Sequence, residues 1–272
     1  MPELPEVART ALSLHHKIKD SHVSEMIIHS GRYSRHGSPI GFELLQSDLP
    51  AKVNKVEFFG KLIVFTFTGK SGKEWYMWNT LGMSGGWRTE HSKHGHVELK
   101  TTKGSVFFTD PRNFGTIRIT DSLEETRKKV RGVGPNHLND EISNELFRER
   151  LMKKPNSTLA EVLMNQSLIG GIGNYIKAEV LYRARLSPNR RVNELSEEDF
   201  SNLNRYTKEV VETSFDNRGA SIRTYADMNG ESGEFVDFFK VYGRRYCEAG
   251  YEVVREITSD GRTTHWVPQL QK

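Results

Sequence analysis

The amino terminus carries the residues best suited to covalent chemistry. The chain opens with the hexapeptide MPELPE. Methionine aminopeptidase removes Met1 when the second residue is small, so the mature chain is expected to begin with the secondary amine of Pro2. An α-amino group has a reference pKa of about 8, which leaves a usable neutral fraction at physiological pH. Such an amine attacks carbonyl carbons, and a secondary amine then forms a permanently cationic iminium ion that acts as an electron sink.

Two carboxylates lie close to that amine in the sequence. Glu3 is its neighbour, and Glu6 follows one helical turn later, where each side chain could move protons around the amine. The same residues also suit a simpler role, because an acidic segment with early prolines is a common start for a helix. From these residues alone, both interpretations stay open.

A glycine-rich segment, LIGGIGN at residues 168–174, lies between two predicted helices. Glycine lets the backbone approach a ligand closely, and Asn174 could cap the second helix, whose free N–H groups would then point at an anion such as a phosphate. The segment is not a dinucleotide fingerprint, because it follows a helix and not a strand, and it is not a Walker A loop. A tight helical hairpin that needs glycine for packing is the alternative.

Two loops between predicted strands carry bulky side chains. They are LGMSG at residues 81–85 and DPRNFG at residues 110–115. Met83, Arg112 and Phe114 are residue types that wedge into a base stack or fill the gap left by an extruded base. The alternative is that Met83 and Phe114 cap the hydrophobic core.

Histidines at positions 91, 94 and 96 form a further candidate group. An HxH pattern on a strand can bind zinc. No acidic or cysteine partner lies at ligand spacing, however, so a solvated or phosphate-contacting role is favoured over a metal site, which we do not predict. The basic run KKVR at residues 128–131 is typical of a solvated helix face.

Composition limits the class of protein that positions these residues. The 272 residues include 39 Lys and Arg against 35 Asp and Glu, 36% hydrophobic residues and 27% charged residues, which excludes collagen-like, mucin-like and wholly disordered chains. No apolar run approaches the ~20 residues of a membrane span, and the amino terminus lacks the regions of a secretion signal. The single cysteine, Cys247, cannot form an intrachain disulfide. We therefore expect an intracellular protein that is not secreted and does not associate with a membrane.

The pattern of apolar residues predicts an α+β fold. Val7, Ala11 and Leu14 recur at helical spacing and predict a short helix at the amino terminus. From about residue 52 to 120, short β-branched or aromatic runs predict a β-sandwich or barrel. These runs are KVNKVEFF, KLIVFTFT, KEWYMWNT, HVELK, SVFFT and GTIRIT.

Beyond the breaker GVGP at residues 132–135, the period becomes helical. The predicted helices are ISNELFRERLM, LAEVLMNQ with a capping box from Thr158 to Glu161, NYIKAEVLYRA and SEEDFSNLNRYTKEVVETSF. Residues 217–234 lack apolar periodicity and predict a long surface loop. The tail alternates around SDG at residues 259–261, which predicts a β-hairpin.

These motifs together resemble one family over nearly the whole chain, the formamidopyrimidine-DNA glycosylases and endonuclease VIII enzymes of base excision repair. The matching segments, in order, are MPELPEV, GK at residues 60–61, LGMSG, KHGHV, DPRNFG, GVGP, GGIGNYIKAE, RTYADMNGESGEF, VYGR and GRTTHW. The resemblance implies a catalytic domain at 1–132 with an amino-terminal helix on a β-sandwich, a helix-two-turn-helix domain with a lesion-capping loop at 133–234, and a finger hairpin at 235–272. Damaged double-stranded DNA would lie in the cleft between the domains of a monomer.

The resemblance also implies roles for individual residues. Pro2 would attack C1′ of the damaged nucleotide, and Glu3 would be the general acid and base, supported by Glu6. Lys61 would assist phosphate contact and proton transfer during strand cleavage, and Arg262 in the finger would bind the phosphate of the final elimination.

Further residues correspond to positions that contact DNA. His94, Arg112 and Asn174 would contact it directly, and Met83, Arg112 and Phe114 would fill the gap after base flipping. No cofactor is implied by this chemistry, since β-elimination and δ-elimination follow from the iminium ion alone.

One departure from the family concerns the finger. It commonly carries four cysteines on zinc, whereas the matching hairpin here retains only Cys247. The hairpin resembles the zincless finger of some members, so we expect no zinc and expect the finger to be held by packing of Tyr246, Tyr251, Val253 and Trp266.

The resemblance leaves the lesion class with an order of preference. The loop RTYADMNGESGEF, with Met83 and Phe114, resembles the formamidopyrimidine branch, which implies excision of oxidised purines, 8-oxoguanine and formamidopyrimidines, followed by nicking through β,δ-elimination. A zincless finger resembles endonuclease VIII relatives, so oxidised pyrimidines are the alternative. A non-catalytic protein that binds damaged DNA is a third interpretation, against which the presence of Pro2, Glu3 and Lys61 argues.

Overall fold

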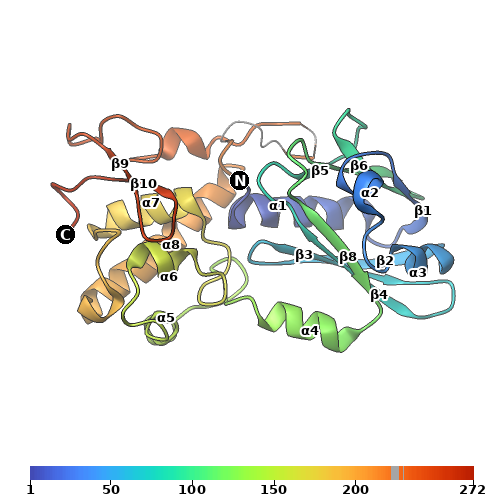
Figure 1. Cartoon of the computed structure of the whole chain (residues 1–272), viewed down its shortest axis with the longest axis horizontal. Coiled ribbons are helices and arrows are strands. Elements are labelled where there is room, and N and C mark those ends of the chain that lie inside the picture. The colour runs from blue at the N-terminus through green and yellow to red at the C-terminus, as the bar shows by residue number, and fades with distance from the viewer. Residues whose placement is uncertain (222–226, 229) are drawn as a thin grey trace.

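The computed structural model describes residues 1–221, 227, 228 and 230–272 of the chain. Its two halves lie side by side, and the amino terminus lies between them (Figure 1). One half contains the first helix and the large sheet, and the other contains the long helices and the carboxyl-terminal hairpin. No helix in this described part is long and apolar enough to cross a membrane.

The first helix, α1 (Leu4–Ile18), is 15 residues long and therefore longer than the short helix predicted. Pro5 lies in its first turn, where no intrahelical N–H bond is lost. The face that carries Val7, Ala11 and Leu14 is buried. The helix contacts both β2 (Ala51–Phe59) of one half and α8 (Glu197–Asp216) of the other. The start of α1 is thereby placed between the two halves.

Antiparallel strands form one large sheet in the order β5-β7-β6-β1-β2-β3-β4-β8. The strands are β1 (His22–Ile28), β2 (Ala51–Phe59), β3 (Leu62–Thr68), β4 (Glu74–Thr80), β5 (Gly86–Arg88), β6 (Gly95–Thr101), β7 (Gly104–Thr109) and β8 (Thr116–Thr120). The six predicted runs are all strands. β1 was not predicted because its buried positions do not alternate, and β5 was not predicted because it is only 3 residues long.

The sheet folds over so that its two ends pack face to face. Trp87 on β5 lies 5.4 Å from Phe65 on β3, measured between ring centroids. The indole Nε1 of Trp87 also donates a hydrogen bond to Oδ1 of Asn79 on β4 at 3.0 Å. Because β5 is far from β3 and β4 in the order of the sheet, these contacts join two layers. The predicted β-sandwich is confirmed as a single sheet folded on itself.

Short helices connect the strands and lead into the second half. They are α2 (Arg32–His36), α3 (Phe42–Ser47) and α4 (Leu123–Arg131). The basic run at residues 128–131 lies in the last turn of α4 with its charged side chains exposed. The prediction of a solvated helix face is confirmed.

The second half consists mainly of helices, and all four that were predicted are present. They are α5 (Asn144–Leu151), α6 (Leu159–Met164), α7 (Asn174–Ala184) and α8 (Glu197–Asp216), with a 3-10 turn, η1 (Val192–Glu194), before α8. α7 has the bounds predicted from the sequence, and α6 begins with the predicted capping box of Thr158 and Glu161. Residues 175–182 of α7 are all buried, so this helix is the centre of the second half.

The segment after α8 leads to the finger. Of the loop predicted at 217–234, residues 222–226 and 229 lie outside the described residues. The finger contains a 3-10 turn, η2 (Phe235–Phe238), and the antiparallel strands β9 (Val254–Ile257) and β10 (Thr263–Trp266), which confirm the predicted hairpin.

A buried carboxylate fastens the finger to α7. Glu179 is 0% exposed and accepts hydrogen bonds from the backbone N–H groups of Lys240, Val241 and Tyr242 at 2.8 to 3.0 Å. Beside it, finger side chains pack against Ala178 and Tyr182 of α7. These finger side chains are Val241, Cys247, Val253 and Val267. The finger is therefore continuous with the core of the second half.

The set of residues predicted to pack the finger was wrong in part. Val253 is buried, but Tyr246 and Tyr251 are 53% and 44% exposed. Trp266 is half-buried and donates its indole N–H to Glu256 at 2.9 Å. Small side chains fill the interface with α7, whereas Tyr246 and Tyr251 are exposed.

Candidate active site

The carboxylate of Glu3 lies at the amino-terminal end of α7. Oε1 of Glu3 accepts a hydrogen bond from the backbone N–H of Tyr175 at 3.0 Å, and Oε2 accepts one from Ile176 at 3.2 Å. The free N–H groups and the dipole of a helix favour negative charge at this end. The anion predicted there was a phosphate, and that prediction was wrong because a carboxylate of the chain itself occupies the position.

Asn174 does not cap α7, contrary to the prediction. The capping residue is Gly173, which has no side chain of its own, and the first turn is capped instead by the carboxylate of Glu3. The side-chain amide of Asn174 instead donates to the carbonyl of Thr263 in the finger at 2.9 Å. Its contact with DNA stays a prediction.

The glycines before α7 allow a close approach of the amino terminus. A Cβ at Gly173 would lie 2.1 Å from Cδ of Glu3. Gly171 has a φ of +94°, and a Cβ there would lie 2.5 Å from Cβ of Leu4. The backbone N–H of Leu4 donates to the carbonyl of Gly171 at 3.0 Å. The glycine-rich segment is therefore a tight packing turn, as the alternative interpretation proposed.

Glu6 joins the amino terminus to the segment that follows α8. One carboxylate oxygen accepts from the backbone N–H of Glu3 at 2.7 Å. The other accepts from the backbone N–H of Ala220 at 2.7 Å and from the Tyr175 hydroxyl at 3.0 Å. Burial raises the pKa of Glu6, and these hydrogen bonds oppose that rise. Glu6 thus orients the backbone next to Glu3.

Lys61 is the third charged group of the site. Its Nζ donates to the carbonyl of Ile172 at 2.7 Å, within the turn that precedes α7. Burial lowers the pKa of Lys61, the attraction of Glu3 opposes this shift, and the nearby charge of Arg262 adds to it. Lys61 therefore lies within electrostatic reach of both Glu3 and the finger arginine.

The amino terminus lies among the same charges. Met1 is present in this structure, and Pro2 is buried. Burial lowers the pKa of the terminal amine, while Glu3 and Glu6 raise it and Lys61 lowers it. Removal of Met1 would turn the amide nitrogen of Pro2 into a secondary amine beside Glu3.

Burial gives Glu3 the acid strength that proton transfer near neutral pH requires. Burial raises the pKa of Glu3 from its usual 4.5 to about 7, against the opposing effects of Lys61 and of the two N–H groups of α7. A group is most effective as a general acid and base when its pKa lies near the working pH. Glu3 can therefore both accept and donate a proton near the terminal amine.

The two loops with bulky side chains are held together by Asp110. Its carboxylate accepts from the Ser84 hydroxyl at 2.6 Å and from the backbone N–H of Gly115 at 2.7 Å, and Asp110 is 1% exposed. This role of Asp110 was not predicted from the sequence, although a polar residue at the start of a turn between strands is a common anchor of that turn. Both loops are fixed to each other by this one side chain.

The bulky side chains on these loops point away from the core. Met83 is 38% exposed and Phe114 is 53% exposed, so the alternative that they cap the core was wrong. Arg112 is exposed, and its guanidinium lies over the ring of Phe114 at 5.0 Å from the centroid. The three side chains are available to a ligand on this surface.

The histidines do not form a joint site. His96 is 6% exposed and hydrogen-bonds to the Ser30 hydroxyl and to the carbonyl of Asp110, each at 2.8 Å, so a solvated or phosphate-contacting role for His96 was wrong. His94 is half-buried, and His91 is exposed. Among the residues that the structure describes, no cluster of His, Cys, Asp and Glu could hold a metal ion.

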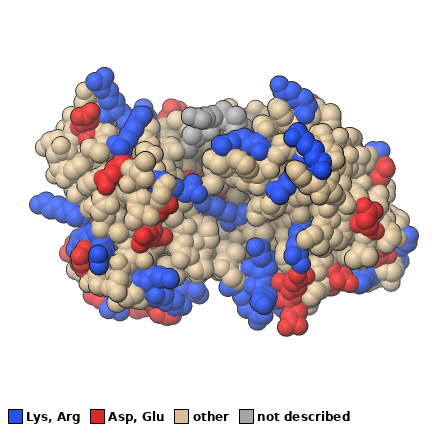
Figure 2. Space-filling model, in the orientation of Figure 1, with Lys and Arg blue, Asp and Glu red and all other residues tan. Residues whose placement is uncertain are grey.

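Positive charge surrounds the hollow between the two halves. Figure 2 shows Lys and Arg side chains on both sides of this hollow, while most Asp and Glu side chains on the same face lie further out. Arg112 on one half and Arg262 on the finger are both exposed. Such a distribution attracts a polyanion to the cleft.

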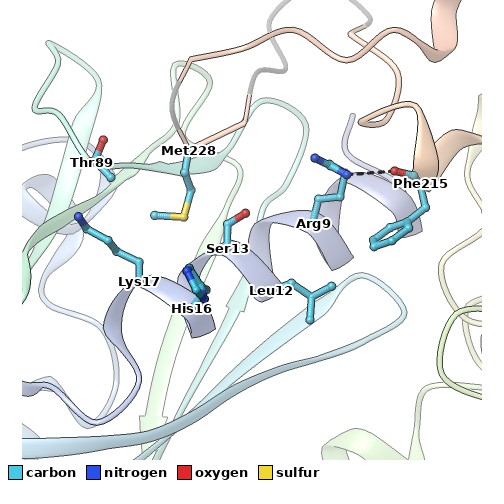
Figure 3. Close-up of a pocket in the computed structure, with 8 residues that line it drawn as sticks. All are labelled: Arg9, Leu12, Ser13, His16, Lys17, Thr89, Phe215 and Met228. Carbon is cyan, nitrogen blue, oxygen red and sulfur yellow. Dashed lines mark hydrogen bonds between the residues drawn. The ribbon is translucent and has the colours of Figure 1, made fainter.

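A separate pocket of about 440 Å³ lies beside α1 (Figure 3). Its lining comprises Arg9, Leu12, Ser13, His16, Lys17, Thr89, Phe215 and Met228. Arg9 donates to the carbonyl of Phe215 at 3.1 Å, as the dashed line shows. Neither Glu3 nor Glu6 is among the described residues that line it, so the pocket is distinct from the site at α7.

Comparison with known proteins identifies the family. The family model for the formamidopyrimidine-DNA glycosylase N-terminal domain matches residues 1–117, and that for the formamidopyrimidine-DNA glycosylase H2TH domain matches residues 133–226. A formamidopyrimidine-DNA glycosylase of Desulfitobacterium hafniense (strain DSM 10664 / DCB-2) is 32% identical over 283 aligned residues that cover 100% of both chains.

Solved structures agree with the sequence matches. A mutant of the Lactococcus lactis FPG enzyme, in complex with DNA containing Fapy-dG, has a TM-score of 0.86 at 28% identity over 100% of each chain. The wild-type Lactococcus lactis enzyme, in complex with DNA containing an oxidised pyrimidine, has a TM-score of 0.84 at 26% identity over the same share. The chain therefore belongs to the formamidopyrimidine-DNA glycosylase family of DNA-repair enzymes.

Proposed function

We propose that this chain is a bifunctional DNA glycosylase and abasic-site lyase whose nucleophile is the amine of mature Pro2. The observation that supports this most directly is the environment of Glu3. Its buried carboxylate, with a pKa raised to about 7, is held by the end of α7 beside the amino terminus. A nucleophilic amine needs such a neighbour, because its own proton has to leave and a proton has to reach the leaving group.

The proposed reaction needs only the residues of the chain. Attack of the Pro2 amine on C1′ would release the damaged base, and opening of the sugar ring would give an iminium ion. That cation acidifies the hydrogen on C2′, so β-elimination of the 3′ phosphate and then δ-elimination of the 5′ phosphate can follow. Lys61 and Arg262 would neutralise the phosphates, and Glu3 would transfer the protons.

DNA would bind in the positively charged hollow as damaged duplex, with the protein as a monomer. We propose that His94, Arg112 and Asn174 contact the DNA, and that Met83, Arg112 and Phe114 fill the gap left by the flipped nucleotide. The exposure of Met83, Arg112 and Phe114 on loops fixed by a buried carboxylate supports this role. A loop that is already fixed loses little further backbone freedom when its side chains enter DNA.

We propose oxidised purines, 8-oxoguanine and formamidopyrimidines, as the preferred lesions. The relative bound to DNA with Fapy-dG supports this class, together with the exposed Met83 and Phe114. Oxidised pyrimidines are the second candidate, because a relative also binds DNA that contains one. The loop RTYADMNGESGEF, whose sequence favours oxidised purines by resemblance, falls partly outside the described residues.

Borohydride trapping on a panel of duplexes tests the function and the lesion class together. The duplexes would carry 8-oxoguanine, a formamidopyrimidine, an oxidised pyrimidine or an abasic site, and removal of Met1 would be confirmed by mass spectrometry. We expect a covalent adduct on the amino-terminal peptide, fastest with an oxidised purine, and a smaller yield with Pro2→Gly. Tight binding to damaged DNA without an adduct on any duplex would place the chain in the non-catalytic class.

We further propose that the finger holds no zinc and that the reaction needs no metal. The finger has one cysteine, and the carboxylate of Glu179 fastens it to α7 in the way described above. Exhaustive treatment with EDTA is therefore expected to leave both cleavage and the melting temperature unchanged, as measured on the same preparation before and after dialysis. Loss of cleavage that added zinc restores would show that the finger is a metal site.

A further inference from the structure

A buried ion pair ties the turn of the finger to α7. Nζ of Lys177 lies 2.6 Å from Oδ2 of Asp260, and the two side chains are 0% and 5% exposed. Neither residue takes part in the reaction proposed above. Exposed ion pairs contribute about 0 to 1 kcal/mol to stability. Removing one member of a buried pair leaves an uncompensated charge, so this pair constrains where the turn can lie.

Asp260 uses its second oxygen to shape the turn itself. Oδ1 accepts from the Thr258 hydroxyl at 2.6 Å and from the backbone N–H of Arg262 at 3.4 Å. The backbone N–H of Thr258 also donates to the carbonyl of Arg262 at 3.1 Å. One carboxylate therefore connects α7 to the backbone that presents the exposed arginine.

The same turn of α7 holds the catalytic carboxylate. The backbone N–H groups of Tyr175 and Ile176 bind Glu3, and Lys177 is the next residue. Burial lowers the pKa of Lys177, its hydrogen bond to Asp260 and the charge of Glu3 oppose this shift, and Arg262 adds to it. The charges of Glu3 and Arg262 therefore both reach Lys177.

We propose that Lys177 is a positioning residue, which through its ion pair with Asp260 holds the finger turn so that Arg262 faces the site of Glu3. The inference depends on the proposed function only for the role of Arg262 in the last elimination. The placement of the turn is a property of the protein alone. Two separate measurements can therefore test the two statements.

The first measurement follows the turn without DNA. Backbone order parameters of Gly261 and Arg262 would be measured by NMR relaxation on the full chain, for wild type, Lys177→Met and Asp260→Asn. We expect them to fall from about 0.85, typical of rigid backbone, to below about 0.6 in both variants. Lys240→Met is the matched control, because it removes a finger lysine whose pair with Glu248 is exposed (43% and 57%). A turn that stays rigid in Lys177→Met would overturn the inference.

The second measurement separates the steps of the reaction on an abasic-site duplex. In Lys177→Met we expect trapping to stay near the wild-type rate, while conversion of the β-product to the δ-product slows by about 10-fold to 100-fold, as for loss of one hydrogen bond to a charged group. Arg262→Ala should show the same pattern, the double variant should be no slower, and Lys177→Arg should restore the step. Equal loss of trapping and δ-elimination would mean that Lys177 acts through Glu3, and would overturn the proposal.

The test also covers a variant that does not fold and a wild-type chain that forms no adduct. If Lys177→Met does not fold, Lys177→Met/Asp260→Leu removes both charges and avoids a buried unpaired carboxylate. If the wild-type chain forms no adduct with any duplex, the proposed function is wrong, but the order parameters still decide whether the ion pair holds the turn.

Discussion

Replacing Glu3 by glutamine is expected to slow base release by about 10²-fold to 10⁴-fold, the usual contribution of a general acid and base. Glutamine has nearly the same shape and can still accept a hydrogen bond from α7, but it cannot gain or lose a proton. Binding to damaged duplex should therefore stay close to that of wild type. Single-turnover excision and borohydride trapping measure the two steps, and fluorescence anisotropy measures binding.

The pH dependence provides an internal control for this variant. Because burial raises the pKa of Glu3 to about 7, the pH profile of kcat/KM for wild type should bend near pH 7, and the profile of Glu3→Gln should not. A carboxyl whose pKa is raised on folding destabilises the folded state when it is ionised. For Glu3, this destabilisation of the folded state is absent below the usual pKa of 4.5 and complete above about 7.

Glu3→Gln should consequently be no less stable than wild type at pH 8, as measured by thermal unfolding at pH 5 and pH 8. A variant that loses activity because it unfolds would contradict the assignment, and so would one that excises at the wild-type rate.

Gly173→Ala should strongly slow base excision, although it removes no functional group. The backbone at Gly173 has φ −128° and ψ −160°, which alanine adopts without strain. The added Cβ would lie 2.1 Å from Cδ of Glu3 and 2.4 Å from its Oε1, so the carboxylate has to move away from α7. Misplacement of a reacting group by about 1 Å can cost about 10²-fold in rate. We expect a loss of that order in single-turnover excision.

Gly132→Ala is the matched control for this variant. Gly132 has φ −72°, and the nearest atom to an added Cβ is the carbonyl oxygen of Lys129 at 3.3 Å, with no atom of Glu3 within 4 Å. It should excise at the wild-type rate. If Gly173→Ala also did so, the close approach of Glu3 to α7 would not be needed for catalysis.

Local patterns in the sequence predicted most of the elements. α7 has the predicted bounds because a glycine turn precedes it and apolar residues continue through it. β1 was missed because only two of its seven residues, Val23 and Met26, are buried, which gives no alternating pattern. Strands of this kind are fixed by pairing with distant segments, in this case with β2 and β6.

The residues of the candidate site could be predicted from the sequence, but the contacts between them could not. Pro2, Glu3 and Lys61 were found by residue type and by resemblance. That the end of α7 binds Glu3 joins positions 3 and 175, and no local pattern contains that information. Lys177 is hidden for the same reason, since a lysine within an apolar helix gives no sign of its partner, Asp260, 83 residues later.

Because the finger is attached to α7, the site at Glu3 is expected to form only after the finger has been translated. α7 supplies the N–H groups that hold Glu3, and its own buried carboxylate, Glu179, accepts hydrogen bonds from Arg183 on the same helix and from the backbone N–H groups of residues 240–242. A ribosome adds about 5 to 20 residues per second from the amino end, so α7 emerges seconds before its finger partners do. Until then Glu179 has its ion pair with Arg183 but lacks the backbone donors of the finger, and a buried carboxylate with unmade hydrogen bonds destabilises the fold around α7. In nascent or prematurely terminated chains, we therefore expect α7 not to hold Glu3 in its final position. Base removal would then be confined to chains that have been translated through the finger.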